Sequence, residues 1–178
     1  MKKTMQGTKI AKYIKKGTKD DIKHLFEGIY NEYFKLVYFV AFSYIKHEQK
    51  TEDIVEETFL HFFEKCTDFA WVSQISNVKA YLCSCAKNAS LREFKNQSRM
   101  SDVENIEYLI VDEKECQTET DLINILDGID SDSVDIINDH IFLDLTFNEI
   151  AKNKKTSINT IKSKYRRAIQ KIRRKFKK

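Results

Sequence analysis

The chain has 178 residues and a mass of 21.0 kDa, a size that suits one or two small domains rather than a large enzyme body. Hydrophobic residues make up 42% of it and charged residues 33%, with 4 glycines and no proline. This composition favours long uninterrupted helices and argues against collagen-like, disordered and β-rich classes. We therefore expect an all-α protein.

The net charge of +4 is unevenly distributed along the chain. Residues 101–150 contain 15 acidic residues and a single basic one, Lys114, whereas residues 151–178 contain 13 basic residues and no acidic one. A dense cationic block attracts a polyanion over long distances, whatever the total charge is. Nucleic acid is therefore the first partner that the sequence indicates.

The N-terminus, Met-Lys-Lys-Thr-Met-Gln-Gly, leads into further lysines without the apolar run of a signal peptide. The longest apolar stretch, from Leu36 to Ile45, is about ten residues long and too short to span a bilayer. We therefore expect a cytoplasmic protein without membrane insertion. The cysteines contain no CxxC pair and are expected to be reduced packing residues: Cys66, Cys83, Cys85 and Cys116.

Helical periodicity dominates residues 18 to 97. Thr18, with Asp21 at the third helical position, is typical of a helix start. A second helix over residues 30–45 is so rich in apolar residues that it should be enclosed and form the centre of the domain. Further helices are predicted at about residues 51–66 and 77–96.

Residues 100–121 have no sustained period and carry acids that repel one another, so we interpret them as an acidic linker. It divides the chain into one unit at residues 1–99 and another at 122–178. In the second unit, a short helix from Leu122 should end at Gly128. Another helix is marked by its apolar positions Val134, Ile137, Ile141 and Leu145.

A helix-turn-helix is predicted at the C-terminal end. Thr146 and Glu149 form a capping box that starts a short helix, and Ser157 is a good N-cap for the next one. The second helix has a polar face whose short side chains can reach base edges in the major groove while its cations neutralise phosphates. The alternative is a basic helix that is merely solvated or binds acidic surfaces. The DNA-facing residues are Asn159, Thr160, Lys162, Ser163, Lys164, Arg166, Arg167 and Lys171.

The segments Glu149-Ile150-Ala151, Ser157 and Thr160-Ile161-Lys162-Ser163-Lys164-Tyr165-Arg166-Arg167-Ala168 resemble region four of bacterial sigma factors. More narrowly, they resemble the extracytoplasmic-function (ECF) group, whose members keep only regions two and four. The resemblance implies that this helix reads the minus-35 promoter element. Lys154-Lys155 stands where the family usually has Leu-Gly, so we expect a lysine to take a positive φ angle.

The octet Glu52-Asp53-Ile54-Val55-Glu56-Glu57-Thr58-Phe59 places like charges four residues apart twice. Each such pair costs about 0.2–0.5 kcal/mol on an isolated helix, a cost that a cationic partner would reverse. A solvated acidic face is the alternative. The octet resembles the region-two helix that binds core RNA polymerase, which implies polymerase contacts for Asp53, Glu56, Glu57 and Phe59.

The segment Asn77-Val78-Lys79-Ala80-Tyr81-Leu82, followed by Ala86-Lys87-Asn88, resembles the part of region two that leads into melting of the minus-10 element. Cations for the backbone and aromatic or amide groups for an unstacked base suit that task. For Tyr81 we favour burial over base stacking. The implied minus-10 residues are Lys79, Tyr81, Lys87, Asn88, Arg92, Lys95 and Arg99.

The sequence is therefore identified as a member of the ECF sigma factors, with a region-2-like domain, an acidic linker and a region-4-like domain. The expected partners are core RNA polymerase, promoter DNA and an anti-sigma factor, which in this group is often membrane-bound. We expect no catalysis, metal or cofactor. One alternative is a helix-turn-helix regulator that acts without core polymerase. Another, a thiol or metal enzyme, would use the cysteines with His24, His47, His61 or His140.

Overall fold

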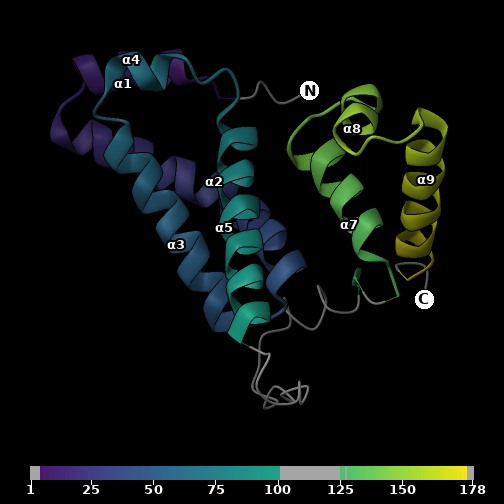
Figure 1. The fold of residues 1–178 in the computed structure, drawn as a ribbon. Helices are drawn as coiled ribbons and strands as arrows, with labels where there is room; N and C mark the ends of the chain where they lie inside the picture. Colours follow the sequence, from purple (N-terminus) through teal and green to yellow (C-terminus); the bar gives the residue numbers. More distant parts are fainter. Residues whose placement is uncertain (1–4, 101–124, 127, 176–178) are drawn as a thin grey trace.

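The computed structural model describes residues 5–100, 125–126 and 128–175, with side chains up to residue 96 in the first range (Figure 1). All regular elements within these ranges are helices, which confirms the predicted all-α class. The predicted linker, apart from Met100, and the predicted helix start at Leu122 lie outside the described residues. The elements are α1 (Gly7–Lys16), α2 (Lys19–Ile45), α3 (Glu48–Lys65), α4 (Phe69–Ser73), α5 (Val78–Met100), α7 (Ser131–Ile137), the π-helix η1 (Asn138–Phe142), α8 (Phe147–Asn153) and α9 (Ile158–Lys175).

Helix α2 begins at the predicted capping box, in which Thr18 and Asp21 satisfy each other's backbone N–H groups. It then continues for 27 residues, so the two helices expected between residues 18 and 45 are one. Gly28 alone cannot interrupt it, because a glycine costs a helix only about 1 kcal/mol and the chain contains no proline. Burial of Ile29 and Tyr33 just after the glycine stabilises the helix across this point.

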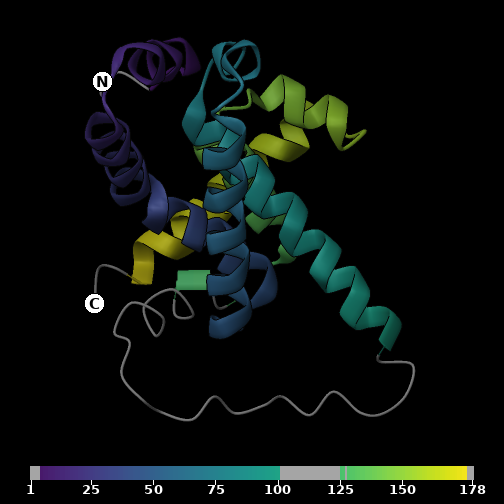
Figure 2. The same cartoon turned by 90° about the vertical axis from the view of Figure 1, so that its left-hand side faces the viewer.

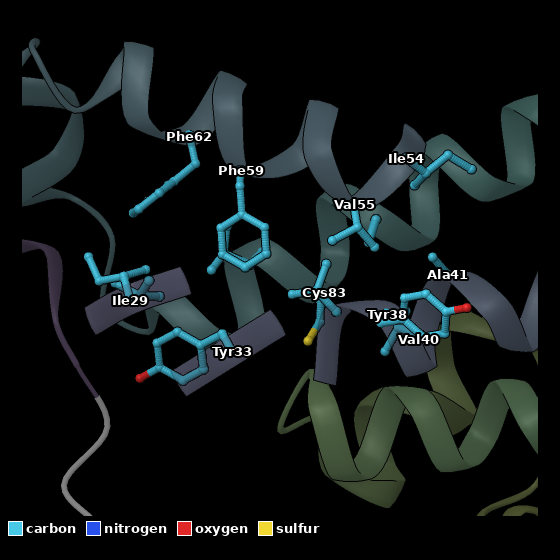
Figure 3. Packing of buried hydrophobic residues seen from close by; sticks show 14 of the residues in the cluster. Ile29, Tyr33, Tyr38, Val40, Ala41, Ile54, Val55, Phe59, Phe62 and Cys83 are labelled. Carbon is cyan, nitrogen blue, oxygen red and sulfur yellow. The ribbon is translucent and has the colours of Figure 1, made fainter. Parts of the chain in front are cut away.

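The core of the N-terminal unit lies between α2, α3 and α5. In Figure 3, Ile29 and Tyr33 from α2 face Phe59 and Phe62 from α3, and Cys83 of α5 lies among the same buried side chains. Phe62 is fully buried. The apolar stretch predicted to be the centre of the domain therefore does occupy the centre.

Helices α1 and α4 were not predicted from the sequence. They pack against each other at one end of the unit, where the Gly7 N–H donates to the Ile75 carbonyl at 2.8 Å. A Cβ atom at Gly7 would lie 1.7 Å from the carbonyl oxygen of Val72, so only glycine permits this approach. Asp68 caps α4 by accepting hydrogen bonds from the backbone of Ala70 and Trp71.

The C-terminal unit has a small core of its own around Ile136, Ile150, Ala151 and Ile161. Its helices begin at the predicted caps: Thr146 and Glu149 form the capping box of α8, and Ser157 accepts from the backbone N–H of Thr160 at 3.0 Å. In the turn between α8 and α9, Lys155 has a φ angle of 50°, which confirms the expected left-handed lysine. Gly128 also takes a positive φ, 68°, as its predicted helix-ending role requires.

The two units pack against each other. Figures 1 and 2 show α7 and η1 beside α2 and α5, whereas α3 lies on the opposite side of the N-terminal unit. Phe39 of α2 and Phe142 of η1 meet with ring centroids 5.3 Å apart, and Leu126 and Val134 join the main buried cluster. The units are therefore in contact as well as connected in sequence.

Candidate polymerase and nucleic-acid interfaces

Helix α3 divides into a buried face and a charged one. Val55, Phe59 and Phe62 point into the core, while Asp53, Glu56 and Glu57 are exposed and form what we call the α3 acidic face. The pKa of Tyr30, which packs nearby on α2, is raised by burial and by the charges of Glu56 and Glu52. The negative charges on this side of α3 are therefore close enough to α2 to affect the ionisation of Tyr30.

Phe59 was predicted to contact polymerase, but the structure places it in the core. It is 2% exposed, and its ring lies 4.8 Å from that of Tyr30 and 5.9 Å from that of Phe63, measured between centroids. Its contribution is to hold α3 against α2, which orients the acids on the other side of the helix. The exposed apolar residue on α3 is instead Leu60, at 60% exposed, whose departure from the buried stripe is a signal that sequence reasoning missed.

The residues predicted for minus-10 binding fall into two groups on α5. Asn88, Arg92 and Lys95 are exposed, whereas Lys79 and Lys87 are mostly covered by the C-terminal unit. The side chain of Arg99 lies outside the described residues. Only the first group faces solvent in this conformation.

Lys79 and Lys87 each contact carboxylates of the C-terminal unit. The Lys87 ammonium lies 2.7 Å from Asp139 and 3.1 Å from Asp135, and the Lys79 ammonium lies 2.7 Å from Asp144. Burial lowers the pKa of Lys87, but its hydrogen bond to Asp139 and the surrounding negative charges outweigh burial and raise the pKa above its ordinary value. Both lysines are therefore already paired in this conformation.

Tyr81 packs against other aromatic rings. Its ring meets Trp71 edge-on at 5.4 Å and lies 5.9 Å from Phe62, and burial raises its pKa. The ring is partly buried against the core near α4. The preference for burial over base stacking therefore stays a prediction.

Helix α9 presents the predicted polar face. Ile161 and Ala168 are buried against the rest of the unit, and the polar residues on the other side point outward. Lys164 is partly covered and contacts Asp132 at 2.7 Å, while the Lys171 ammonium donates to the Gly128 carbonyl at 2.9 Å. The exposed members of the predicted minus-35 set are Asn159, Thr160, Lys162, Ser163, Arg166, Arg167 and Lys171.

Sequence reasoning missed the acids that face α5. Asp135 and Asp139 are four residues apart on α7 and η1, and Asp144 follows η1. Their helical spacing was visible in the sequence, but an acid at such a position is ordinarily solvated. Nothing in the sequence indicated that they face Lys79 and Lys87, because that pairing depends on how the two units pack.

Two cysteines of the described residues are packing residues, whereas a third, Cys85, is only partly buried. Cys66 and Cys83 are buried, and burial raises the pKa of each thiol to about 12, which keeps it protonated and unreactive at neutral pH. Cys116 lies outside the described residues. Within the part of the chain that the structure describes, no three His, Cys, Asp or Glu side chains gather where a metal ion could bind.

Two known proteins or families are similar to this chain. Residues 29–100, which include most of α2 and all of α3, α4 and α5, match the family model of sigma-70 region 2. This part of the chain is therefore similar to region 2 of the sigma-70 sigma factors. The chain is also similar to RNA polymerase sigma factor SigV of Bacillus subtilis, with 28% identity over 138 residues that cover 76% of this chain and 81% of the relative.

The match to sigma-70 region 2 and the similarity to SigV both support the resemblance seen in the sequence. The matched region holds both the α3 acidic face and the predicted minus-10 residues. The similarity to SigV spans 138 residues, so it is not confined to that region. None of the helices in the described ranges is both long and apolar enough to cross a membrane.

Proposed function

We propose that this chain is a sigma factor of the ECF type, which directs core RNA polymerase to promoters through three separate surfaces. The α3 acidic face binds core polymerase, α5 engages and opens the minus-10 element, and α9 reads the minus-35 element. The factor supplies recognition, and the polymerase performs the chemistry. The resemblance to the ECF group further implies an anti-sigma factor that masks both units.

The observation that carries this proposal is the α3 acidic face, because it is exposed and its negative charges have no positive partner among the described side chains. Glu52 with Glu56, and Asp53 with Glu57, are like-charged neighbours one helical turn apart, and no ion pair to them is found among the described side chains. Helix α3, which carries this face, lies on the side of the N-terminal unit away from the C-terminal unit (Figures 1 and 2). A cationic partner surface would turn a local cost into a gain.

The proposed minus-35 surface is supported by the geometry of α8 and α9. A two-turn helix with a full capping box precedes a longer helix across a tight turn, the arrangement that places a second helix in the major groove. Asn159 and Thr160 lie in the first turn of α9, where short side chains reach base edges, and Lys162 and Arg166 lie within reach of flanking phosphates. The two roles are thus divided along one helix.

The proposed minus-10 surface is supported by the exposed half of α5. Asn88 offers an amide to an unstacked base, and Arg92 offers a cation to the strand. Lys79 and Lys87 belong to the same helix and become part of this surface only when the carboxylates that hold them move away.

Run-off transcription from a promoter library tests the proposal, with core polymerase alone and with the purified chain. We expect promoter-specific transcripts only when the chain is present. Replacing Lys162, Lys164, Arg166 and Arg167 with glutamate should abolish promoter binding yet spare core association. As a matched control with four reversals as well, Lys12→Glu, Lys15→Glu, Lys16→Glu and Lys35→Glu change exposed lysines outside α5 and α9 and should leave both intact.

The rival regulator gives a different pattern in the same assay. A helix-turn-helix regulator binds duplex DNA without core polymerase and leaves the products of purified core unchanged. Promoter binding that needs core polymerase, and that is lost with the α9 variant, supports the sigma-factor role. Duplex binding by the chain alone, with no effect on core polymerase, refutes it.

A further inference from the structure

The contact between the two units is centred on a buried ion pair. Asp139 is 6% exposed, and its carboxylate lies 2.7 Å from the Lys87 ammonium, which also lies 3.1 Å from Asp135. The Tyr44 hydroxyl of α2 donates to Asp135 Oδ1, the same oxygen that the Lys87 ammonium approaches. A lysine held between two carboxylates and covered on most sides is a specific contact rather than a chance surface pair.

A second pair lies near the start of α5. Asp144 accepts from the Asn77 amide at 2.6 Å and from the Lys79 ammonium at 2.7 Å, and Lys79 also donates to the Ile141 carbonyl at 3.1 Å. The backbone of Asp144 is left-handed, with a φ angle of 57°. A non-glycine residue adopts this conformation at an energetic cost, and here the bend carries a carboxylate whose two oxygens both face the N-terminal unit.

Much of this interface is polar as well as buried. Asn138 of η1 is fully buried and donates its amide to the Ser43 hydroxyl of α2 at 2.9 Å, beside the ring contact of Phe39 with Phe142. Buried polar pairs fix the register of a contact, but they add little net affinity because the same groups bond to water when separated. Such an interface is therefore specific and can come apart.

The lysines in this contact are two of those proposed for minus-10 binding. An ammonium that is paired at 2.7 Å with a carboxylate, as Lys87 is with the buried Asp139 and Lys79 with the more exposed Asp144, is not free to neutralise a phosphate. We propose that Asp135, Asp139 and Asp144, the C-terminal acid cluster, are a built-in competitor of the DNA strand that holds Lys79 and Lys87 while the factor is free. The competitor has an advantage, because the chain that links the units keeps its local concentration high.

This inference rests on the proposed function for the identity of the displaced ligand, but the contact itself can be tested without polymerase. The variant Asp139→Asn with Asp144→Asn keeps the shape of both side chains and removes their charge. The control variant Asp20→Asn with Glu27→Gln removes the same charge from exposed positions on the first half of α2. The probe is a fluorescent single-stranded 20-mer of mixed sequence.

We expect the interface variant to bind the single strand roughly five- to tenfold more tightly than the wild type, at the lower end of coupling between sites. The control should stay within about twofold, because general electrostatics change equally in both variants. Small-angle scattering should show a larger radius of gyration for the interface variant alone. Equal affinity gains in both variants, or an unchanged radius, would overturn the inference.

A cross-link tests the same point without changing charge. Ser43→Cys with Asn138→Cys, in a background with Cys85→Ser and Cys116→Ser, places thiols where side chains now meet at 2.9 Å. Mild oxidation should join them in the free factor and lower single-strand binding at least tenfold, and dithiothreitol should restore it. Absence of the cross-link, or equal binding before and after reduction, would contradict the closed contact.

The outcomes separate this inference from the proposed function. The α3 acidic face is remote from the contact, so both the oxidised and the reduced protein can be offered to core polymerase (Figure 2). If neither joins core while oxidation still blocks single-strand binding, the competitor stands and the sigma mechanism fails. If both join core and oxidation changes nothing in strand binding, the sigma mechanism stands and the competitor fails.

Discussion

Neutralising the α3 acidic face should stabilise the free protein while weakening its attachment to polymerase. The variant is Glu56→Gln with Glu57→Gln, which removes one partner from each like-charged pair, Glu52 with Glu56 and Asp53 with Glu57. Gln and Glu have similar helix propensities, so the helix itself is little affected. Both side chains are exposed and lie opposite the buried stripe, so no packing is lost.

The size of the gain follows from the helix geometry. Each like-charged pair at this spacing costs about 0.2–0.5 kcal/mol, so the free energy of unfolding should rise by roughly 0.4–1 kcal/mol. For a chain of this size that corresponds to an increase in Tm of about 1–4 °C. In the complex the substitution is expected to be unfavourable, because it removes charges that would face a cationic surface of polymerase. The affinity for core should therefore fall about tenfold or more.

Differential scanning calorimetry and a core-binding titration measure the two effects on the same samples. The charge-matched control, Asp20→Asn with Glu27→Gln, disrupts the 3.9 Å pair between Lys23 and Glu27 and should not raise the Tm or weaken core binding. A lower Tm for the α3 variant would show that its acids are paired within the chain. Unchanged affinity for core would show that this face does not bind polymerase.

Three further predictions concern stability. Phe62→Ala should lower the free energy of unfolding by about 3–5 kcal/mol in urea titrations, because the ring is fully buried, and a loss below about 1 kcal/mol would contradict the described core. Lys155→Gly should raise the Tm by about 1–2 °C by relieving a φ angle of 50°, whereas Lys152→Gly within α8 should lower it; a fall for both would refute strain at Lys155. Burial alone would raise the pKa of Asp135, but hydrogen bonds from Lys154 and Tyr44 and the charge of Lys87 lower it, so its contribution to stability is complete above about pH 5 and is lost as the pH falls below about 4. Thermal melts of Asp135→Asn should therefore differ most from the wild type at pH 7 and differ less as the pH falls below about 4, and a constant difference would contradict this assignment.

The helices that the sequence predicted well are those with local signals. The capping boxes at Thr18 and Thr146 fix helix starts through hydrogen bonds within four residues, and both occur where predicted. The left-handed lysine was also foreseen, because the two-helix turn requires that conformation whatever residue occupies it. Helix α1 was missed because its stability comes from the close approach of Gly7 to Val72, a contact between segments far apart in the sequence.

The candidate sites also differ in whether local sequence or contacts between distant segments determine them. The exposed acids of α3 and the polar face of α9 follow from helical spacing alone, so the sequence placed them correctly on the surface. Phe59 was misplaced because a motif records which residues occur together, without saying which of them face inward. The pairing of Lys87 with Asp139 could not be predicted, because it depends on how the two units pack, which neither sequence indicates.

Association with core RNA polymerase tests the central claim most directly. The purified chain and bacterial core enzyme are mixed at about 0.15 M salt, where weak surface attraction is largely screened, and separated by gel filtration. The account predicts that the wild-type chain elutes with core and that the Glu56→Gln, Glu57→Gln variant largely does not. A folded wild-type chain that elutes alone would contradict it.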